Sequence, residues 1–187
     1  MPTSTSRTRS SIEGRPDRSD VFRILGIDPG SHSTGYGLLE ESGGRLREIE
    51  SGAIRPGRNK QFLHRLSDIH EALSGLVIRF RPDAVAVENP FLARNVRSAM
   101  QLGEARAAAL LPAVKAGIPV FEYAPRHVKA AVVGHGGAEK AQVARMVALL
   151  LGLSALPTPL DATDALAVAI CHANRSSGLR RLQKSLA

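Results

Sequence analysis

The sequence predicts an α/β domain built on a mixed β-sheet. Short apolar runs that are typical of strands alternate with longer segments that carry apolar residues at the three- and four-residue spacing of helices. The first three strand-like runs follow one another directly, whereas the later ones are separated by helical segments. Because consecutive strands favour antiparallel pairing and strand–helix–strand units favour parallel pairing, we expect both kinds of pairing in one sheet.

The expected elements rest on these two patterns and follow in chain order. Gly, Ser and Pro residues between the first three strands suit hairpin turns. The first helix ends before Pro82, and the second is unusually rich in alanine. The expected strands are residues 23–28, 36–40, 48–55, 84–88 and 118–123, and the expected helices are residues 61–81, 95–116, 140–151 and 161–173.

Composition bounds the organisation of the chain. Its 187 residues, 43% of them hydrophobic, suffice for one compact domain with additional ends. We assign this domain to residues 21–175. Residues 1–20 hold almost no apolar side chains, which predicts a disordered basic N-terminal extension, and residues 176–187 are expected to form a flexible basic C-terminal tail.

The charge balance points to a polyanionic partner. The formal net charge is +8, and Lys and Arg side chains can replace the counterions on nucleic-acid phosphates. Cys171 is the only cysteine, so the chain forms neither an internal disulfide nor a cysteine-rich zinc site. With no signal-peptide pattern and no apolar run of about 20 residues, we expect a cytoplasmic protein that does not enter a membrane.

Four carboxylates fall at the ends of expected elements, and each also has a purely structural interpretation. Asp28 ends the first strand in an Asp-Pro-Gly turn sequence that it could simply anchor. Glu88 ends an apolar strand and could be an ordinary surface residue. Asp161 and Asp164, three residues apart at the start of a helix, share one face but also resemble a capping pair.

Taken together, these four acids predict a metal-dependent catalytic site at one edge of the sheet. Bringing several carboxylates together is repulsive, and divalent cations offset that repulsion. Hard oxygen ligands favour Mg²⁺ or Mn²⁺, and two such ions can activate water and stabilise the leaving oxygen of a phosphodiester. His172 is the histidine nearest to an acidic cluster in sequence, and we interpret it as a helix-surface residue.

The order of these motifs resembles the RuvC family of Holliday junction resolvases, and the resemblance extends over about residues 23–175. The matching segments are Gly26-Ile27-Asp28-Pro29-Gly30, Thr34-Gly35-Tyr36-Gly37, Ala86-Val87-Glu88, Phe121-Glu122-Tyr123-Ala124, Val132-Val133-Gly134, Ala138-Glu139-Lys140 and the run from Asp161 to Ala167.

The resemblance implies an RNase H-like fold, a five-stranded mixed sheet flanked by helices on both faces. It implies a metal-dependent endonuclease that resolves four-way (Holliday) junctions by paired nicks in opposite strands during recombination and repair. The family's metal-binding acids correspond to Asp28, Glu88, Asp161 and Asp164, so no acid is missing. The resemblance also implies a homodimer that works with the RuvA–RuvB branch-migration complex.

The resemblance further suggests residues that bind DNA. The family's base-stacking loop aromatic corresponds to Phe91, although Asn89-Pro90 before it departs from the usual pattern and stiffens the loop. Lys129 and Lys140 match basic residues near the scissile phosphate. Arg94 and Arg97, just past the loop, could reach phosphate or could belong to a solvated helix face.

The alanine-rich helix offers a surface for dimerisation, because one stripe of it carries small and apolar side chains that would let another helix approach closely. The alternative is that the stripe only packs on its own sheet. It consists of Val96, Met100, Gly103, Ala107, Leu110 and Val114.

Three other functions share parts of this pattern. Actin-like kinases and ATPases open with a similar strand and turn, but they need two domains and usually a longer chain. A non-catalytic junction-binding module would keep the basic surface without needing four acids. An RNase H-like nuclease that acts on RNA–DNA hybrids or on other branched DNA is the third, and the sequence separates it poorly from a junction resolvase.

Overall fold

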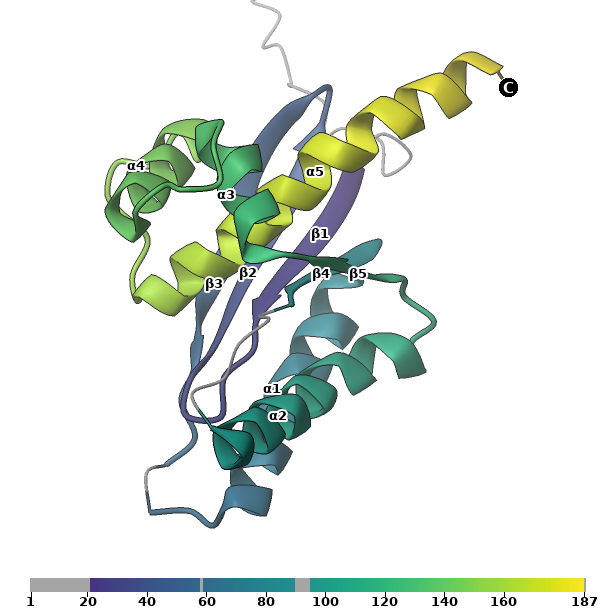
Figure 1. Ribbon diagram of the computed structural model, residues 1–187. Helices are drawn as coiled ribbons and strands as arrows, with labels where there is room; N and C mark the ends of the chain where they lie inside the picture. The colour runs from purple at the N-terminus through teal and green to yellow at the C-terminus, as the bar shows by residue number, and fades with distance from the viewer. Residues whose placement is uncertain (1–20, 58, 90–94, 187) are drawn as a thin grey trace, which may run out of the picture.

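The computed structural model describes residues 21–57, 59–89 and 95–186 (Figure 1). Within these residues the chain forms one sheet and flanking helices. The strands are β1 (Val21–Asp28), β2 (Thr34–Ser42), β3 (Arg45–Ile54), β4 (Ala84–Glu88) and β5 (Val120–Tyr123), and the helices are α1 (Phe62–Phe80), α2 (Val96–Lys115), α3 (Pro125–Val133), α4 (Lys140–Leu151) and α5 (Leu160–Leu186).

The sheet is mixed, as the sequence predicts. Its five strands lie in the order β3-β2-β1-β4-β5. The first three form an antiparallel meander. After helical crossovers, β4 pairs in parallel with β1, and β5 pairs in parallel with β4. The carboxyl ends of β1, β4 and β5 therefore meet at one edge of the sheet, which is where two of the four predicted acids lie.

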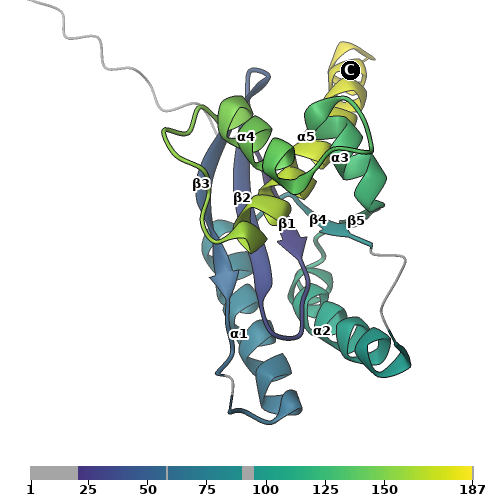
Figure 2. The same ribbon diagram turned by 60° about the vertical axis from the view of Figure 1, so that its left-hand side comes forward.

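Helices cover both faces of the sheet, which confirms the predicted architecture. Helices α1 and α2 pack on one face, and α3, α4 and α5 pack on the other (Figures 1 and 2). Because successive side chains of a strand point to opposite faces, Ile24 belongs to the core beneath α5 and Leu25 to the core beneath α1. Both are almost fully buried, so β1 lies in the centre of the molecule.

Several element boundaries differ from those expected. Residues 125–133 form α3, which the sequence pattern missed because the helix is short. Helix α5 runs to Leu186, well past residue 173. Among the described residues, no helix is long and apolar enough to cross a lipid bilayer. The expected extension at residues 1–20 lies outside the described residues.

The prediction that His172 is a helix-surface residue is wrong. Its side chain is only 2% exposed and lies where α5 packs against β5. The Nδ1 atom of His172 is 2.8 Å from the hydroxyl oxygen of Tyr123, and its ring centroid is 4.4 Å from that of Phe121. A buried, hydrogen-bonded histidine of this kind stabilises the packing of α5 on the sheet.

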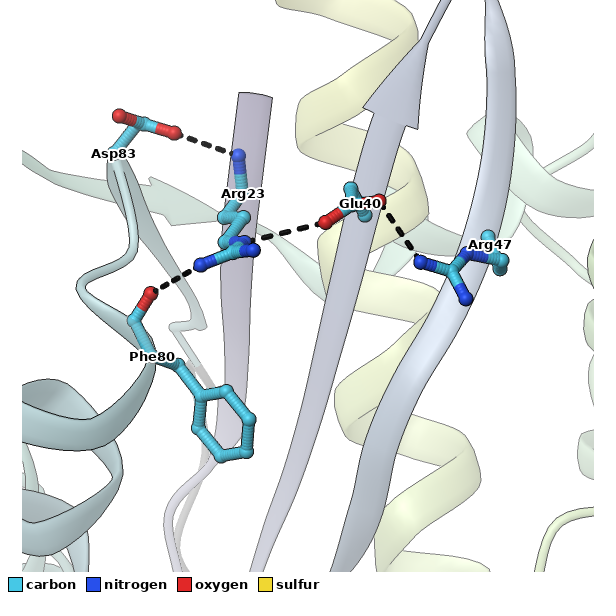
Figure 3. Close-up of polar contacts among 5 residues, drawn as sticks. All are labelled: Arg23, Glu40, Arg47, Phe80 and Asp83. Atoms are coloured by element: carbon cyan, nitrogen blue, oxygen red, sulfur yellow. Dashed lines mark hydrogen bonds and ion pairs between the residues drawn. The ribbon is translucent and has the colours of Figure 1, made fainter. Parts of the chain in front are cut away.

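A polar network holds the other end of the sheet together, far from the edge that carries Asp28. Glu40 of β2 lies between Arg23 of β1 and Arg47 of β3, with N···O distances of 3.3 and 3.0 Å (Figure 3). Arg23 also donates to the carbonyl of Phe80 at the end of α1, and its backbone N–H donates to Asp83. The network therefore ties three strands to the α1–β4 connection.

Replacing Glu40 with Gln is expected to destabilise the protein. Burial raises the pKa of Glu40, but hydrogen bonds from Arg47 and Arg23 outweigh it and hold that pKa below its ordinary value. A depressed pKa means that the carboxylate stabilises the fold at neutral pH and loses this effect as pH falls through the folded-state pKa. We expect a loss of about 1 to 2 kcal/mol at pH 7 by urea denaturation. The exposed Glu71→Gln should change little.

Candidate active site

Asp28 and Glu88 lie side by side because β1 and β4 are parallel neighbours. Ile27 pairs with Val87, so the next positions along the two strands are Asp28 and Glu88. Both carboxylates follow fully buried strand residues, and each is itself partly buried. The two apolar strands thus bring two acidic side chains to the same edge of the sheet.

Helix α5 brings the other two acids to this edge by packing unusually close to the sheet. A Cβ atom on Gly26 would lie 2.0 Å from the carbonyl oxygen of Ala165, and one on Gly35 would lie 2.0 Å from that of Asp161. Gly35 is also the β2 partner of Asp28. Only glycine permits this approach, and it sets the first turn of α5, with Asp161 and Asp164, over the end of β1.

The four carboxylates interact electrostatically. Burial raises the pKa of Asp28 to about 7, and repulsion from Asp164, Glu88 and Asp161 adds to the effect. The pKa of Glu88 is also raised, first by burial and then by Asp164. Asp28 therefore lies within electrostatic range of the other three predicted acids.

The charges of this site fit a divalent cation. The carboxyl groups of Asp28 and Glu88 have no hydrogen-bond or ion-pair partner among the described residues, although both side chains are partly buried and burial raises the pKa of each. The oxygen ligands are those that Mg²⁺ and Mn²⁺ prefer. In the described part of the chain, no group of three or more acidic, His or Cys side chains is already arranged to hold a metal ion.

Two predicted lysines lie beside the acids. The Nζ atom of Lys140, at the start of α4, is 3.1 Å from Oδ2 of Asp164. This hydrogen bond and the charge of Asp164 raise the pKa of Lys140. Lys129 of α3 is near enough to Glu88 to lower the pKa of that carboxyl, against the larger effect of burial. The site therefore places two cations next to the acidic cluster.

Two further residues reach the site that the sequence did not single out. The hydroxyl of Ser33 donates to Oδ2 of Asp161 over 2.6 Å, and a guanidinium nitrogen of Arg55 lies 3.6 Å from the same oxygen. Ser33 and Asp161 are separated by 128 positions in the sequence. No local sequence pattern marks a contact over such a separation, so neither Ser33 nor Arg55 could be singled out from the sequence.

Of the remaining predicted DNA-binding residues, the structure describes Arg97, which lies exposed in the first turn of α2. Phe91 and Arg94 lie outside the described residues. The assignment of Phe91 to DNA binding therefore rests on the family resemblance, and that of Arg94 rests on its sequence position just past the loop.

Known proteins resemble this chain over nearly its whole folded length. Residues 24–172 match the family model described as crossover junction endodeoxyribonuclease RuvC. The protein of that name from Geobacter metallireducens is 51% identical over 165 residues, which cover 88% of this chain and 99% of the relative. The one from Geobacter sulfurreducens is 53% identical over 153 residues, covering 82% and 93% respectively.

Solved structures agree with the sequence comparisons. The structure of T. thermophilus RuvC in complex with a Holliday junction substrate has a TM-score of 0.79 and 38% sequence identity to this chain. The match covers 83% of this chain and 94% of that one. The motifs, the mixed sheet flanked by helices and these matches agree, and the chain therefore belongs to the RuvC family of crossover junction endodeoxyribonucleases.

Proposed function

We propose that this enzyme resolves four-way DNA junctions with Asp28, Glu88, Asp161 and Asp164 as its catalytic and metal-binding carboxylates. The observation that carries the assignment is geometric: the parallel β1–β4 register sets Asp28 beside Glu88, and the close approach of α5 at Gly26 and Gly35 brings Asp161 and Asp164 over the end of β1. A chain of net charge +8 that nevertheless gathers four acids at one edge fits a site for cations and a phosphodiester.

The proposal includes Mg²⁺ or Mn²⁺ as the cofactor, with two ions per site. Bound ions of this kind lower the pKa of a water molecule and stabilise the charge on the leaving oxygen. The protein's part is to hold oxygen ligands at a sheet edge where burial strengthens their interaction with cations. Lys140 and Lys129 supply positive charge beside the acids, which favours entry of a phosphate group into an otherwise repulsive site.

The DNA contacts of the proposal extend outward from the acids. Lys129 and Lys140 would lie nearest to the scissile phosphate, and Arg97 of α2 would bind the backbone farther away. Phe91 would stack on a base beside the crossover, as the family resemblance implies. Arg94, just past the same loop in sequence, would bind phosphate. These contacts recognise the backbone and shape of branched DNA rather than a long base sequence.

A homodimer is part of the proposal, with the exposed face of α2 as its interface. Ala105, Ala109 and Ala113 face the protein core, whereas Val96, Met100 and Val114 are 77%, 61% and 61% exposed. Leu110, which the sequence placed on this stripe, packs partly against the core, and Leu111 is the exposed leucine. A two-fold pair along α2 would present two equivalent sites to opposite strands of a junction.

Replacing Met100 with Glu is expected to separate the proposed dimer. A charge placed in the apolar stripe would be costly to bury between two helices. Sedimentation velocity should show the variant as a monomer at concentrations where the unaltered protein is a dimer, and paired nicking should fall. Leu63→Glu is the matched control, because Leu63 of α1 is also an exposed apolar side chain, at 73%. If both variants sediment as dimers, α2 is not the interface.

We also propose that the enzyme works with the RuvA–RuvB complex in bacterial recombination and repair, as the family resemblance implies, and that it acts in the cytoplasm, where chromosomal DNA is processed. The rival functions differ in substrate. A junction-binding module would bind without cutting, and a hybrid-specific relative would cut RNA–DNA duplexes better than junctions.

A side-by-side cleavage assay tests the proposal. The enzyme is incubated with a synthetic four-way junction, a linear DNA duplex and an RNA–DNA hybrid of matched sequence, in Mg²⁺, Mn²⁺ or EDTA. We expect symmetrical nicks in opposite strands of the junction with either ion, little cutting of the other substrates and none in EDTA. Bound but uncut junction in both ions would support the binding module, and preferential hybrid cutting would support the third rival.

A further inference from the structure

We propose that Ser33 is a positioning residue for Asp161, and that Arg55 is a counter-charge that a metal ion must displace from the same carboxylate. The inference rests on the proposed function, because it takes Asp161 to be a metal ligand. It adds two residues from the β1–β2 loop and the end of β3 to a site otherwise made by β1, β4 and α5.

The contact between Ser33 and Asp161 is short and directional. The Ser33 hydroxyl donates to Oδ2 of Asp161 over 2.6 Å in a partly buried setting. Hydrogen bonds from a hydroxyl to a carboxylate in this range are the strong, charge-assisted kind. Among the described residues, no hydrogen bond is made to Oδ1 of Asp161. Ser33 therefore fixes the orientation of the carboxyl group while leaving one oxygen for a cation.

The loop that carries Ser33 is held rigidly. The buried hydroxyl of Thr34 donates to the carbonyl of Gly30 over 2.9 Å and accepts from the Gly30 N–H over 3.3 Å. A Cβ atom on Gly30 would lie 2.3 Å from the carbonyl oxygen of Ser33, so the loop is also tightly folded. These contacts fix the backbone of Ser33 relative to the sheet.

Arg55 approaches Asp161 from the neighbouring strand. Thr34 pairs with Ile54 in the antiparallel β2–β3 ladder, so Ser33 and Arg55 occupy the next pair of positions. The guanidinium lies 3.6 Å from Oδ2 of Asp161, and the Arg55 side chain is 61% exposed. This longer and more exposed ion pair is weaker than the serine hydrogen bond, and it reduces the negative charge available to a cation.

The two residues should therefore affect metal binding in opposite directions. Ser33 orients the ligand without neutralising it, and removing such an orienting hydrogen bond typically weakens metal affinity 10- to 100-fold. Arg55 competes with the ion for the same charge, so its removal should strengthen binding. If Ser33 merely tied its loop to α5, its loss would lower stability but leave the affinity for metal unchanged.

The test measures Mn²⁺ affinity of the DNA-free, full-length protein by titration, following the EPR signal of free Mn²⁺. We expect Ser33→Ala to weaken Mn²⁺ binding about tenfold, Ser33→Thr to restore it, and Arg55→Gln to strengthen it about twofold or more. The Mn²⁺ concentration for half-maximal junction cleavage should rise for Ser33→Ala in the same proportion. Ser31→Ala, the same change two residues earlier in the loop, is the matched control.

The Asp161→Asn variant distinguishes a failure of the proposed metal site from a failure of the proposed role of Ser33. Unchanged Mn²⁺ affinity in Asp161→Asn would overturn both the proposed site and this inference. Reduced affinity in Asp161→Asn together with unchanged affinity in Ser33→Ala would overturn the role of Ser33 alone. Weaker binding in Arg55→Gln would likewise overturn the role of Arg55. Circular dichroism and thermal melts establish that each variant is folded, and Ser33→Thr supplies the answer if Ser33→Ala is not.

Discussion

Replacing Asp28 with Asn is expected to abolish junction cleavage while junction binding persists. Asp28 lies between Glu88 on the neighbouring strand and the acids of α5, so it is the centre of the proposed site. A bound metal ion contributes several kcal/mol of transition-state stabilisation, so losing its central ligand should slow cleavage about 10³-fold or more. Cleavage of a labelled four-way junction and a gel-shift assay in Ca²⁺ measure the two properties.

The same variant should be more stable than the unaltered protein in EDTA at neutral pH. Burial and the neighbouring acids raise the pKa of Asp28 to about 7, against roughly 4 in an unfolded chain. A raised pKa means that the protonated group stabilises the fold below about pH 4 and that this contribution is lost as pH rises toward 7. At pH 7.5, Asn should therefore add about 1 to 3 kcal/mol to the free energy of unfolding.

Asp68→Asn provides the control for both measurements. Asp68 is a carboxylate of α1 that pairs with Lys60 over 2.7 Å, and it is not among the groups that raise the pKa of Asp28. Its replacement should leave cleavage unchanged and should not stabilise the protein. Cleavage by Asp28→Asn at the rate of Asp68→Asn would show that Asp28 is only a turn residue.

Replacing Gly35 with Ala is expected to cause the second large loss of activity, although no acid is altered. The new Cβ atom would lie 2.0 Å from the carbonyl oxygen of Asp161 and 3.1 Å from its Cβ atom. Helix α5 must move away, and Asp161 and Asp164 move with it. Because a misplacement of about 1 Å can cost 10²-fold in rate, we expect cleavage to fall about 100-fold, with a loss of stability of about 1 to 3 kcal/mol.

Gly75→Ala separates this effect from a general response to a methyl group. Gly75 lies exposed in α1, and a Cβ atom there would meet nothing within 4 Å. Alanine in a helix interior should stabilise that variant by about 0.5 to 1 kcal/mol and leave cleavage unchanged. Full activity in folded Gly35→Ala would show that close packing of α5 does not position the acids.

The architecture could be predicted from the sequence because most strands and helices of this fold carry local patterns of apolar residues. Strand β4 and helix α4 have the bounds that the apolar runs and helical spacing indicate. Helix α3 was missed, since nine residues provide too few turns for the periodicity to stand out. The length of α5 was underestimated because its apolar pattern ends near residue 173, whereas the helix itself continues to Leu186.

The acids were easier to predict than the residues that support them. Asp28 and Glu88 end strands, and parallel strands end at the same edge, so topology alone brings them together. His172, by contrast, is buried by Tyr123 and Phe121 of β5, about fifty positions away, and nothing near it in sequence marks that contact. The same reason explains why the Ser33–Asp161 hydrogen bond could not be anticipated.

The most direct test of the central claim is anomalous X-ray scattering from crystals of the protein soaked in Mn²⁺. The proposed site predicts anomalous density at the manganese edge among the carboxylates of Asp28, Glu88, Asp161 and Asp164, and its loss in Asp28→Asn crystals. Density elsewhere on the protein, with none at this edge of the sheet at millimolar Mn²⁺, would contradict the assignment of these four acids as the metal-binding active site.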